Sequence, residues 1–207
     1  MSVRTLLVDV GGVLLRERPE FWDLLQREFH APVDVESLFY GPGSPWAECR
    51  TGALDYMEYT RRVAEQLGMD SAILADLRER HEWVLNQPMA AWVRDTHRRG
   101  LEVILVSNAD LTLEERLRAF GLNDVFDAVV NSARVGSAKP DPGIYRHAMK
   151  LTESAPSECL FVDDREKNCR VAHELGLQTL VFCDIDQFCR EVQQRYAAEA
   201  WLIPEGI

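Results

Sequence analysis

The sequence has few features that would cross-link the chain or place it in a membrane. Its five cysteines are odd in number and include no Cys-x-x-Cys pair, which argues against a disulfide framework and against a zinc site. No apolar run approaches the roughly 18 residues that a membrane span needs, and no charged-then-apolar leader precedes the first predicted strand. These absences predict a cytoplasmic protein with reduced thiols and no membrane partner.

Positive charge is also scarce. Lys and Arg number 23 against 34 Asp and Glu, so the formal net charge is -11. Because contacts of Lys and Arg with phosphates supply most of the nonspecific affinity for nucleic acid, this balance argues against a nucleic-acid partner. Internal repeats and low-complexity tracts are missing as well. The hydrophobic fraction of 46% is enough for a sizeable core, in one domain or in one domain with a modest insertion.

Short apolar runs alternate with amphipathic segments over much of the chain. An apolar run at 6–14 indicates a buried strand that delivers Asp9 to its carboxyl end. Further strands are expected at 101–106, 128–130, 160–162 and 179–182, and helices at 88–99, 111–119, 142–151, 166–175 and after about residue 190. This alternation predicts an α/β fold with a Rossmann-like parallel sheet covered on both faces.

A long helical segment interrupts this alternation after the first strand. Apolar residues recur at helical spacing within 21–29, 57–67 and 73–84, and a Gly- and Pro-rich loop lies at 41–45. Roughly seventy residues of predicted helix and loop therefore separate the first strand from the next, far more than a simple strand-to-helix connection requires. We therefore expect a core domain of residues 1–15 and 88–207 and an inserted helical cap domain of residues 16–87.

Polar residues follow three of the predicted strands, and a lysine precedes the helix at 142–151. These residues are Asp9, Ser107, Asn108, Lys139, Asp163 and Asp164. Because the carboxyl ends of parallel strands share one edge of a sheet, the groups are expected to converge on one crevice. Neighbouring carboxylates repel each other, and Mg²⁺ with its preference for oxygen ligands is the usual remedy. Ser107 and Lys139 add a donor and a positive charge suited to phosphoryl oxygens.

Two further groups of residues are candidates for contact with a ligand. Gly11 and Gly12 follow Asp9, where glycine allows a sharp turn and a close approach of the backbone to a bound group. Trp46, Arg50 and Gly52 lie on a predicted loop of the insert that can face the crevice, and Arg50 can meet an anionic substrate. A core role for Trp46 and a surface role for Arg50 stay open as alternatives.

Four motifs in this order resemble those of the haloacid dehalogenase-like hydrolases. They are Asp-Val-Gly-Gly-Val-Leu at 9–14, Val-Ser-Asn at 106–108, Lys-Pro-Asp-Pro at 139–142 and Val-Asp-Asp-Arg-Glu-Lys-Asn at 162–168. The motifs cover the core, and the helical insert resembles the four-helix cap of that family. The resemblance implies a Mg²⁺-dependent phosphatase that acts on a small phosphorylated metabolite, for which a sugar phosphate is one class.

The resemblance also implies a role for each motif residue. Asp9 would be the nucleophile that forms an aspartyl-phosphate, and Ser107 and Lys139 would hold the phosphate. Asp9 and Asp164 would bind Mg²⁺, with Asp163 binding directly or through water. Gly11 would contribute its carbonyl to the metal. Further substrate contacts are expected from Gly11, Gly12, Asn108, Arg50 and Trp46, although Asn108 and Asn168 also suit a role in fastening loops.

The chain departs from the family pattern at Gly11. Most phosphatases of the family carry there a second Asp that acts as general acid and base. General acid–base catalysis is worth about 10²–10⁴-fold, while enzymatic hydrolysis of phosphate monoesters reaches roughly 10²¹-fold, so activity can survive the loss. Two hypotheses remain: a Mg²⁺-dependent phosphatase, and a phosphate-binding or partner-binding protein with little turnover. A response-regulator receiver domain does not fit, because its acidic pair belongs on the first strand.

Overall fold

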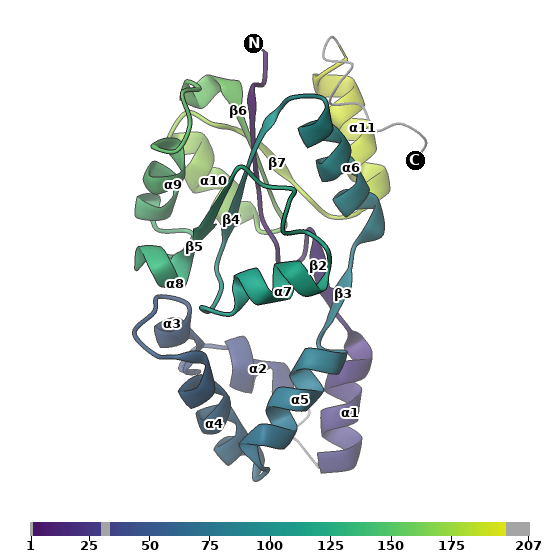
Figure 1. Cartoon of the computed structure of the whole chain (residues 1–207), viewed down its shortest axis with the longest axis vertical. Helices are drawn as coiled ribbons and strands as arrows, with labels where there is room; N and C mark the ends of the chain where they lie inside the picture. The colour runs from purple at the N-terminus through teal and green to yellow at the C-terminus, as the bar shows by residue number, and fades with distance from the viewer. Residues whose placement is uncertain (1, 30–33, 198–207) are drawn as a thin grey trace.

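The computed structural model describes residues 2–29 and 34–197, and Figure 1 shows an α/β architecture. Its main sheet has the strand order β5-β4-β1-β6-β7, and every neighbouring pair in it is parallel. The strands are β1 Thr5–Val8, β4 Glu102–Ser107, β5 Ala128–Asn131, β6 Cys159–Asp163 and β7 Gln178–Val181. The predicted parallel α/β sheet is therefore confirmed. The four later strands differ from their expected bounds by at most one residue, whereas β1 ends at Val8 and covers only the start of the apolar run at 6–14.

Helices cover both faces of this sheet because successive strand residues point to opposite sides. Leu6 and Val8 of β1 pack into one apolar cluster together with α6, α7 and α11, whereas Leu7 packs into a second cluster with α9 and α10. The bounds are α6 Gln87–Arg98, α7 Leu113–Ala119, α9 Pro142–Met149, α10 Glu166–Glu174 and α11 Ile185–Arg195, with α8 Ser132–Val135 and η1 Pro156–Glu158 in connections. In the described part of the chain, no helix has the length and apolar character to cross a membrane.

The last helix begins earlier than the sequence pattern indicates. It was expected after about residue 190, but α11 begins at Ile185 and ends at Arg195. The side chain of Asp184 caps it by accepting a hydrogen bond from the backbone N–H of Gln187 at 2.8 Å. Residues 198–207, over which that helix was expected to continue, lie outside the described residues.

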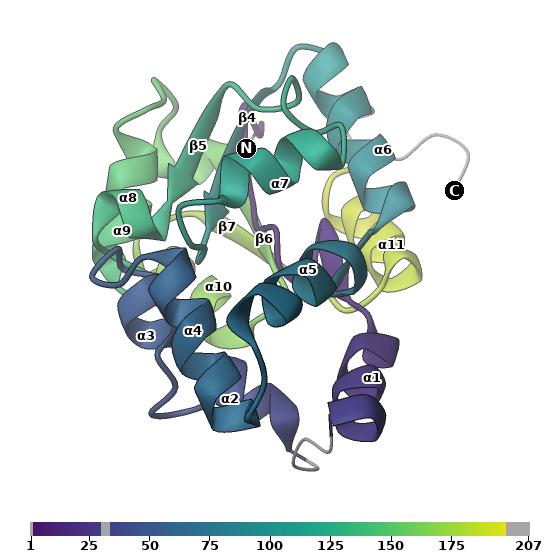
Figure 2. The same cartoon turned by 60° about the horizontal axis from the view of Figure 1, so that its bottom comes forward.

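Among the described residues, a separate group of helices lies at the carboxyl edge of the sheet, below it in Figure 1 and in front of it in Figure 2. We call this group the helical insert. Its members are α1 Pro19–Phe29, α2 Val35–Tyr40, α3 Trp46–Cys49, α4 Tyr56–Leu67 and α5 Ser71–His81. The insert has its own apolar core, which includes Phe21, Phe39, Tyr59, Val63 and Leu74. It thus buries its apolar faces without using the core of the sheet.

The expectation of only helical signals between about residues 29 and 87 is wrong near its C-terminal end, and another short strand lies just before the insert. Strand β2, Leu15–Glu17, pairs antiparallel with β3, Trp83–Leu85. Each strand has three residues and its partner is distant in sequence, so helical or strand periodicity cannot reveal the pairing. Val84, which was assigned to a helical apolar face, lies in β3 and is 38% exposed. The chain enters and leaves the insert through this two-stranded ribbon.

Candidate active site

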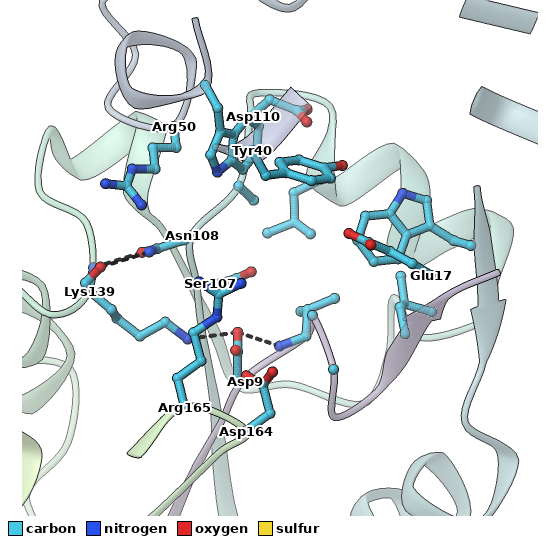
Figure 3. Close-up of a pocket in the computed structure, with 18 of the residues that line it drawn as sticks. Asp9, Glu17, Tyr40, Arg50, Ser107, Asn108, Asp110, Lys139, Asp164 and Arg165 are labelled. Carbon is cyan, nitrogen blue, oxygen red and sulfur yellow. Dashed lines mark hydrogen bonds and ion pairs between the residues drawn. The ribbon is translucent and has the colours of Figure 1, made fainter. Parts of the chain in front are cut away.

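A cavity of about 340 Å³ lies between the carboxyl edge of the sheet and the helical insert (Figure 3). Its lining includes nearly all the candidate residues: Asp9, Gly11, Gly12, Trp46, Arg50, Ser107, Asn108, Lys139, Asp164 and Asn168. Asp163 is fully buried directly behind it, in contact with Lys139. The convergence expected from the strand ends is thus observed in the geometry.

Asp9 lies immediately beyond the central strand of the sheet. Its backbone N–H donates to the carbonyl of Val162 at 3.0 Å, which continues the β1–β6 pairing by one residue. Its Oδ1 accepts hydrogen bonds from the backbone N–H of Val10 at 2.7 Å and contacts the Nζ of Lys139 at 2.7 Å. Both interactions fix one oxygen of the carboxylate. Oδ2 is therefore the oxygen available to a ligand.

Lys139 is a buried cation that contacts residues at the carboxyl ends of three strands, β1, β4 and β6. Its Nζ donates to the carbonyl of Val106 at 2.8 Å and to Oδ2 of Asp163 at 2.7 Å, in addition to the contact with Asp9. Burial alone would lower the pKa of this ammonium, but the charges of Asp9 and Asp163 outweigh burial and raise it. Lys139 consequently keeps its positive charge at neutral pH.

One lysine does not neutralise the carboxylates around it. Oxygen atoms of Asp9, Asp163 and Asp164 lie within 4.8 Å of one another. Burial is the largest cause that raises the pKa of Asp9 to about 7, and the neighbouring carboxylates add to it against the effect of Lys139. Burial, followed by the charge of Asp163, also raises the pKa of Asp164. Within residues 2–29 and 34–197, no side-chain cation forms a salt bridge with Asp164. This all-oxygen donor set with excess negative charge fits a hard divalent cation such as Mg²⁺.

Asp163 differs from its two neighbours because most of its hydrogen-bonding capacity is already used. Its Oδ1 accepts from the backbone N–H of Arg165 at 2.9 Å and from Nδ2 of Asn168 at 2.8 Å, while Oδ2 accepts from Lys139. The Asn168 contact agrees with the loop-fastening role considered for that residue. Asp163 thus holds Lys139 and the start of α10 in place.

The two glycines after Asp9 occupy different surroundings. Gly12 has a φ of +77°, and a Cβ added there would lie 2.5 Å from Oδ2 of Asp164. Gly11 has no atom within 4 Å of such a Cβ, and its φ is outside the left-handed region. Glycine is therefore required at position 12 to leave room for the Asp164 carboxylate. Position 11 can accept a side chain.

We expect Gly12→Ala to weaken binding of Mg²⁺ to the carboxylates of this cavity about 10–100-fold, because the new methyl group displaces the Asp164 carboxylate. The measurement is the Mg²⁺ concentration for half-maximal activity or for half-maximal thermal stabilisation. Gly68→Ala is the matched control, since Gly68 shares a left-handed φ of +67° but has no atom within 4 Å of the added Cβ. Equal Mg²⁺ requirements in both variants would contradict the steric explanation.

Ser107 and Asn108 lie at the carboxyl end of β4 and make different contacts. Ser107 ends β4, pairs with Asn131 of β5, and lines the cavity with 3% of its surface exposed. Asn108 holds the backbone of Lys139 from both sides: its Nδ2 donates to the carbonyl at 2.8 Å and its Oδ1 accepts from the N–H at 2.7 Å. The Asn108 amide thereby fastens the loop of Lys139, the alternative considered beside a substrate contact.

Trp46 and Arg50 of the insert both border the cavity. Trp46 begins the short helix α3 and does not lie on a loop as expected, and its ring packs on those of Tyr40 and Tyr59 at centroid distances of 5.3 and 5.6 Å. It therefore serves the apolar core of the insert while also facing the cavity. Arg50 caps the C-terminal end of α3, and its carbonyl accepts a hydrogen bond from the hydroxyl of Ser132 at 2.5 Å.

Several lining residues were missed in the sequence. They are Glu17, Glu36, Tyr40, Arg78, Trp83, Asp110, Arg116, Arg165 and Lys167. Most of them come from the ribbon and the insert, where no motif marks the residues that face the sheet. Arg165 and Lys167 are different because both lie within the fourth motif, at 162–168, so their positions were a usable signal.

The chain is similar to known hydrolases, among them a phosphatase. The family model of the haloacid dehalogenase-like hydrolases matches residues 3–176. The chain is 25% identical to a sesquiterpene phosphatase of Aspergillus oryzae over 196 residues, which are 93% of this chain and 96% of that protein. It is 33% identical to bifunctional epoxide hydrolase 2 of Sus scrofa over 217 residues, which are 94% of this chain but only 39% of that protein.

The fold also matches a solved structure. A HAD family enzyme of Bacteroides thetaiotaomicron, determined as a complex with magnesium and inorganic phosphate, superposes with a TM-score of 0.72 at 22% identity. The superposition covers 87% of this chain and 94% of that enzyme. At this level of identity the likeness establishes the shared fold.

Proposed function

The chain belongs to the haloacid dehalogenase-like hydrolases, and from this premise we propose that it is a Mg²⁺-dependent phosphatase that hydrolyses a small phosphorylated metabolite. The observation that carries the proposal is the meeting of three carboxylates with Lys139 and Ser107 in one cavity at the carboxyl edge of the sheet. A phosphatase among the relatives and a magnesium and phosphate complex among the structural neighbours support it.

The reaction proceeds in two displacements at phosphorus. Oδ2 of Asp9 attacks the phosphorus atom, the bond from phosphorus to the ester oxygen breaks, and the alcohol departs with a proton taken from water, since Gly11 provides no acid. A water molecule then attacks the phosphorus of the aspartyl-phosphate, which releases inorganic phosphate and restores the Asp9 carboxylate. Ser107 and Lys139 hold the phosphoryl oxygens in both steps.

Mg²⁺ is proposed to be held by Asp9, Asp164 and the carbonyl of Gly11, with Asp163 directly or through water. When bound, the ion supplies positive charge that offsets both the phosphoryl oxygens and the crowded carboxylates. We further propose that residues 16–87 act as a cap domain over a core of residues 1–15 and 88–207. The β2–β3 ribbon supports this division, because it is where the chain passes between the sheet and the insert.

The test is a screen of phosphorylated metabolites for phosphate release, with Mg²⁺ and with a chelator. We expect release with Mg²⁺ only, from a small set of polar esters. Gly11 also favours the second hypothesis, a phosphate-binding protein with little turnover, because an acid is missing where the family has one. Saturable binding of phosphate esters without release from any of them would support that hypothesis and contradict the phosphatase.

Gly11 leads to a prediction about leaving groups. Without a proton donor the departing oxygen carries more negative charge, so kcat/KM should fall steeply as the leaving-group pKa rises. Aryl, acyl and anomeric sugar phosphates should therefore react faster than alkyl esters such as a sugar 6-phosphate. Gly11→Asp should selectively rescue the poor leaving groups, since position 11 has room for a side chain.

The measurement is kcat/KM for a series of esters graded by leaving-group pKa, in the natural protein, in Gly11→Asp and in Gly11→Asn. The asparagine variant controls for bulk, because it has the shape of aspartate but no acidic proton. A flat dependence in the natural protein would mean that another group donates the proton, and the account of Gly11 would be wrong.

A further inference from the structure

Two arginines that line the cavity are neutralised by buried carboxylates. Nε of Arg78 donates to Oε2 of Glu82 at 2.8 Å, with both side chains 2% exposed. Arg116 pairs with Asp110, which is 1% exposed, through an Nη2–Oδ2 contact of 3.0 Å. Each pair brings little net charge to the cavity. Both arginines therefore have a buried carboxylate partner, although Nη1 of Arg78 is also buried without a hydrogen-bond acceptor.

Arg50 and Arg165 lack such partners. Neither forms a salt bridge among the residues that the structure describes, although the protein as a whole is strongly acidic. The Nε of Arg50 is also buried with no hydrogen-bond acceptor. A buried donor without an acceptor is unfavourable, and most such donors in proteins meet a ligand or water. Arg50 consequently presents an unused, charged donor group at the cavity.

The backbone around Arg50 is fixed against the sheet domain. The carbonyl of Arg50 accepts the hydrogen bond from Ser132. The neighbouring Gly52 packs closely against α8, because a Cβ added at Gly52 would lie 2.2 Å from the carbonyl oxygen of Ala133. The close approach of this turn holds Arg50 at the boundary between insert and sheet. Backbone contacts therefore fix the position of Arg50, and its side chain is not needed for this.

Arg50 and Arg165 come from opposite sides of the cavity, Arg50 from the insert and Arg165 from the start of α10 (Figure 3). Burial, followed by the positive charge of Arg165, lowers the pKa of Arg50, so the two guanidinium groups repel each other. An anion between them would relieve this repulsion and supply the missing acceptor.

This anion is distinct from the phosphate that is transferred. Ser107 and Lys139 already serve that phosphate next to Asp9, and Figure 3 shows Arg50 across the cavity from Asp9. The same view shows Glu17 away from Arg50, on the other side of the cavity. Burial, followed by the charge of Glu82, raises the pKa of Glu17 to about 7. In its ionised form this carboxylate repels an anion and so favours an orientation of the ligand in which negative charge faces the arginines.

Resting on the proposed function, we propose that the leaving group of the substrate carries a second anionic group, a carboxylate or another phosphate, which Arg50 and Arg165 bind together. The composition of the cavity agrees, because half of its lining residues are charged. Such a wall suits a compact polyanionic metabolite and disfavours a long apolar chain.

The experiment compares 3-carboxyphenyl phosphate with 3-carbamoylphenyl phosphate, which has the same shape but no second charge. Dissociation constants are measured by calorimetry with Mg²⁺ in the Asp9→Asn protein, where turnover does not interfere. We expect the carboxylate ester to bind about tenfold more tightly or better. Adding Arg50→Gln should remove this preference and leave the binding of the carbamoyl ester unchanged. Arg80→Gln, on the exposed side of the insert, should keep the preference.

Equal affinities for the two esters in the Asp9→Asn protein would overturn the inference. An equal loss for both esters on adding Arg50→Gln would overturn it as well, since Arg50 would then serve the transferred phosphate. Whether the second anionic group can be a phosphate is tested with a phenyl phosphate that carries another phosphate in place of the carboxylate, at the same ring position. The proposed function is judged separately, by Mg²⁺-dependent phosphate release from either ester in the unmutated protein, so the two claims fail independently.

Discussion

Asp9→Asn is expected to abolish phosphate release, with a loss in kcat of about 10⁴-fold or more, while the fold stays intact. The amide oxygen is not a nucleophile toward phosphorus, yet asparagine has nearly the same shape as aspartate. Its Oδ1 can keep accepting from the N–H of Val10 and from Lys139. The loss should therefore be a loss of chemistry alone.

Stability gives the matching control for this substitution. Burial is the main cause that raises the pKa of Asp9 from 3.8 to about 7 in the folded protein. Ionising this carboxyl therefore lowers the free energy of unfolding as the pH rises from about 4, where the unfolded chain ionises, toward 7. Removing the charge should leave the melting temperature of the metal-free protein equal or higher at pH 8. Asp124→Asn, at an exposed position, should leave both activity and stability unchanged. Turnover like that of the natural protein in Asp9→Asn would exclude Asp9 as the nucleophile.

Lys139→Met is expected to have the second largest effect, and it should affect stability as well as activity. The methionine fills most of the space, but it leaves the carboxylates of Asp9 and Asp163 buried without their cation. Breaking a buried ion pair in this way typically costs about 3–5 kcal/mol of unfolding free energy. Losing a charged group that we propose to hold the phosphoryl oxygens should also lower kcat about 10²–10³-fold.

The loss of stability in Lys139→Met should depend on pH. Lys139 lowers the folded-state pKa of Asp9, so this pKa rises further when the lysine is removed. The gap between the folded and unfolded pKa values then widens, and the folded state loses more stability as the pH rises. The deficit in unfolding free energy should thus be largest at pH 8 and smaller at pH 5, as measured by urea denaturation. Lys150→Met, at an exposed position, is the control. A deficit that is the same at both pH values would contradict the buried charge network.

The sheet and the position of the site followed from the sequence because both depend on local patterns. Strand residues such as Leu6, Leu7 and Val8 are fully buried, so their apolar run is continuous and easy to recognise. The carboxyl ends of parallel strands share an edge, so Asp9, Ser107 and Asp163 could be brought together without any knowledge of strand order. Knowing that the strands are parallel was sufficient for this prediction.

The β2–β3 ribbon and the cavity wall of the insert could not be predicted in this way. Leu15 pairs with Leu85 across the whole insert, and a three-residue strand has no periodicity of its own. Similarly, Arg78 and Glu82 form a buried pair whose surroundings include Phe39 and Tyr59, all of which look like ordinary helix residues in the sequence. Such contacts depend on how helices pack, which local spacing does not encode.

The central claim is that Asp9 becomes covalently phosphorylated during turnover. The most direct test is to mix the protein with Mg²⁺ and a good aryl phosphate substrate, quench with acid within one turnover, and measure the intact mass followed by peptide mapping. We predict a mass increase of one phosphoryl group, located on the peptide that contains Asp9 and missing in Asp9→Asn. Phosphate release without any phosphorylated protein under these conditions, or with the phosphoryl group on another residue, would contradict the account.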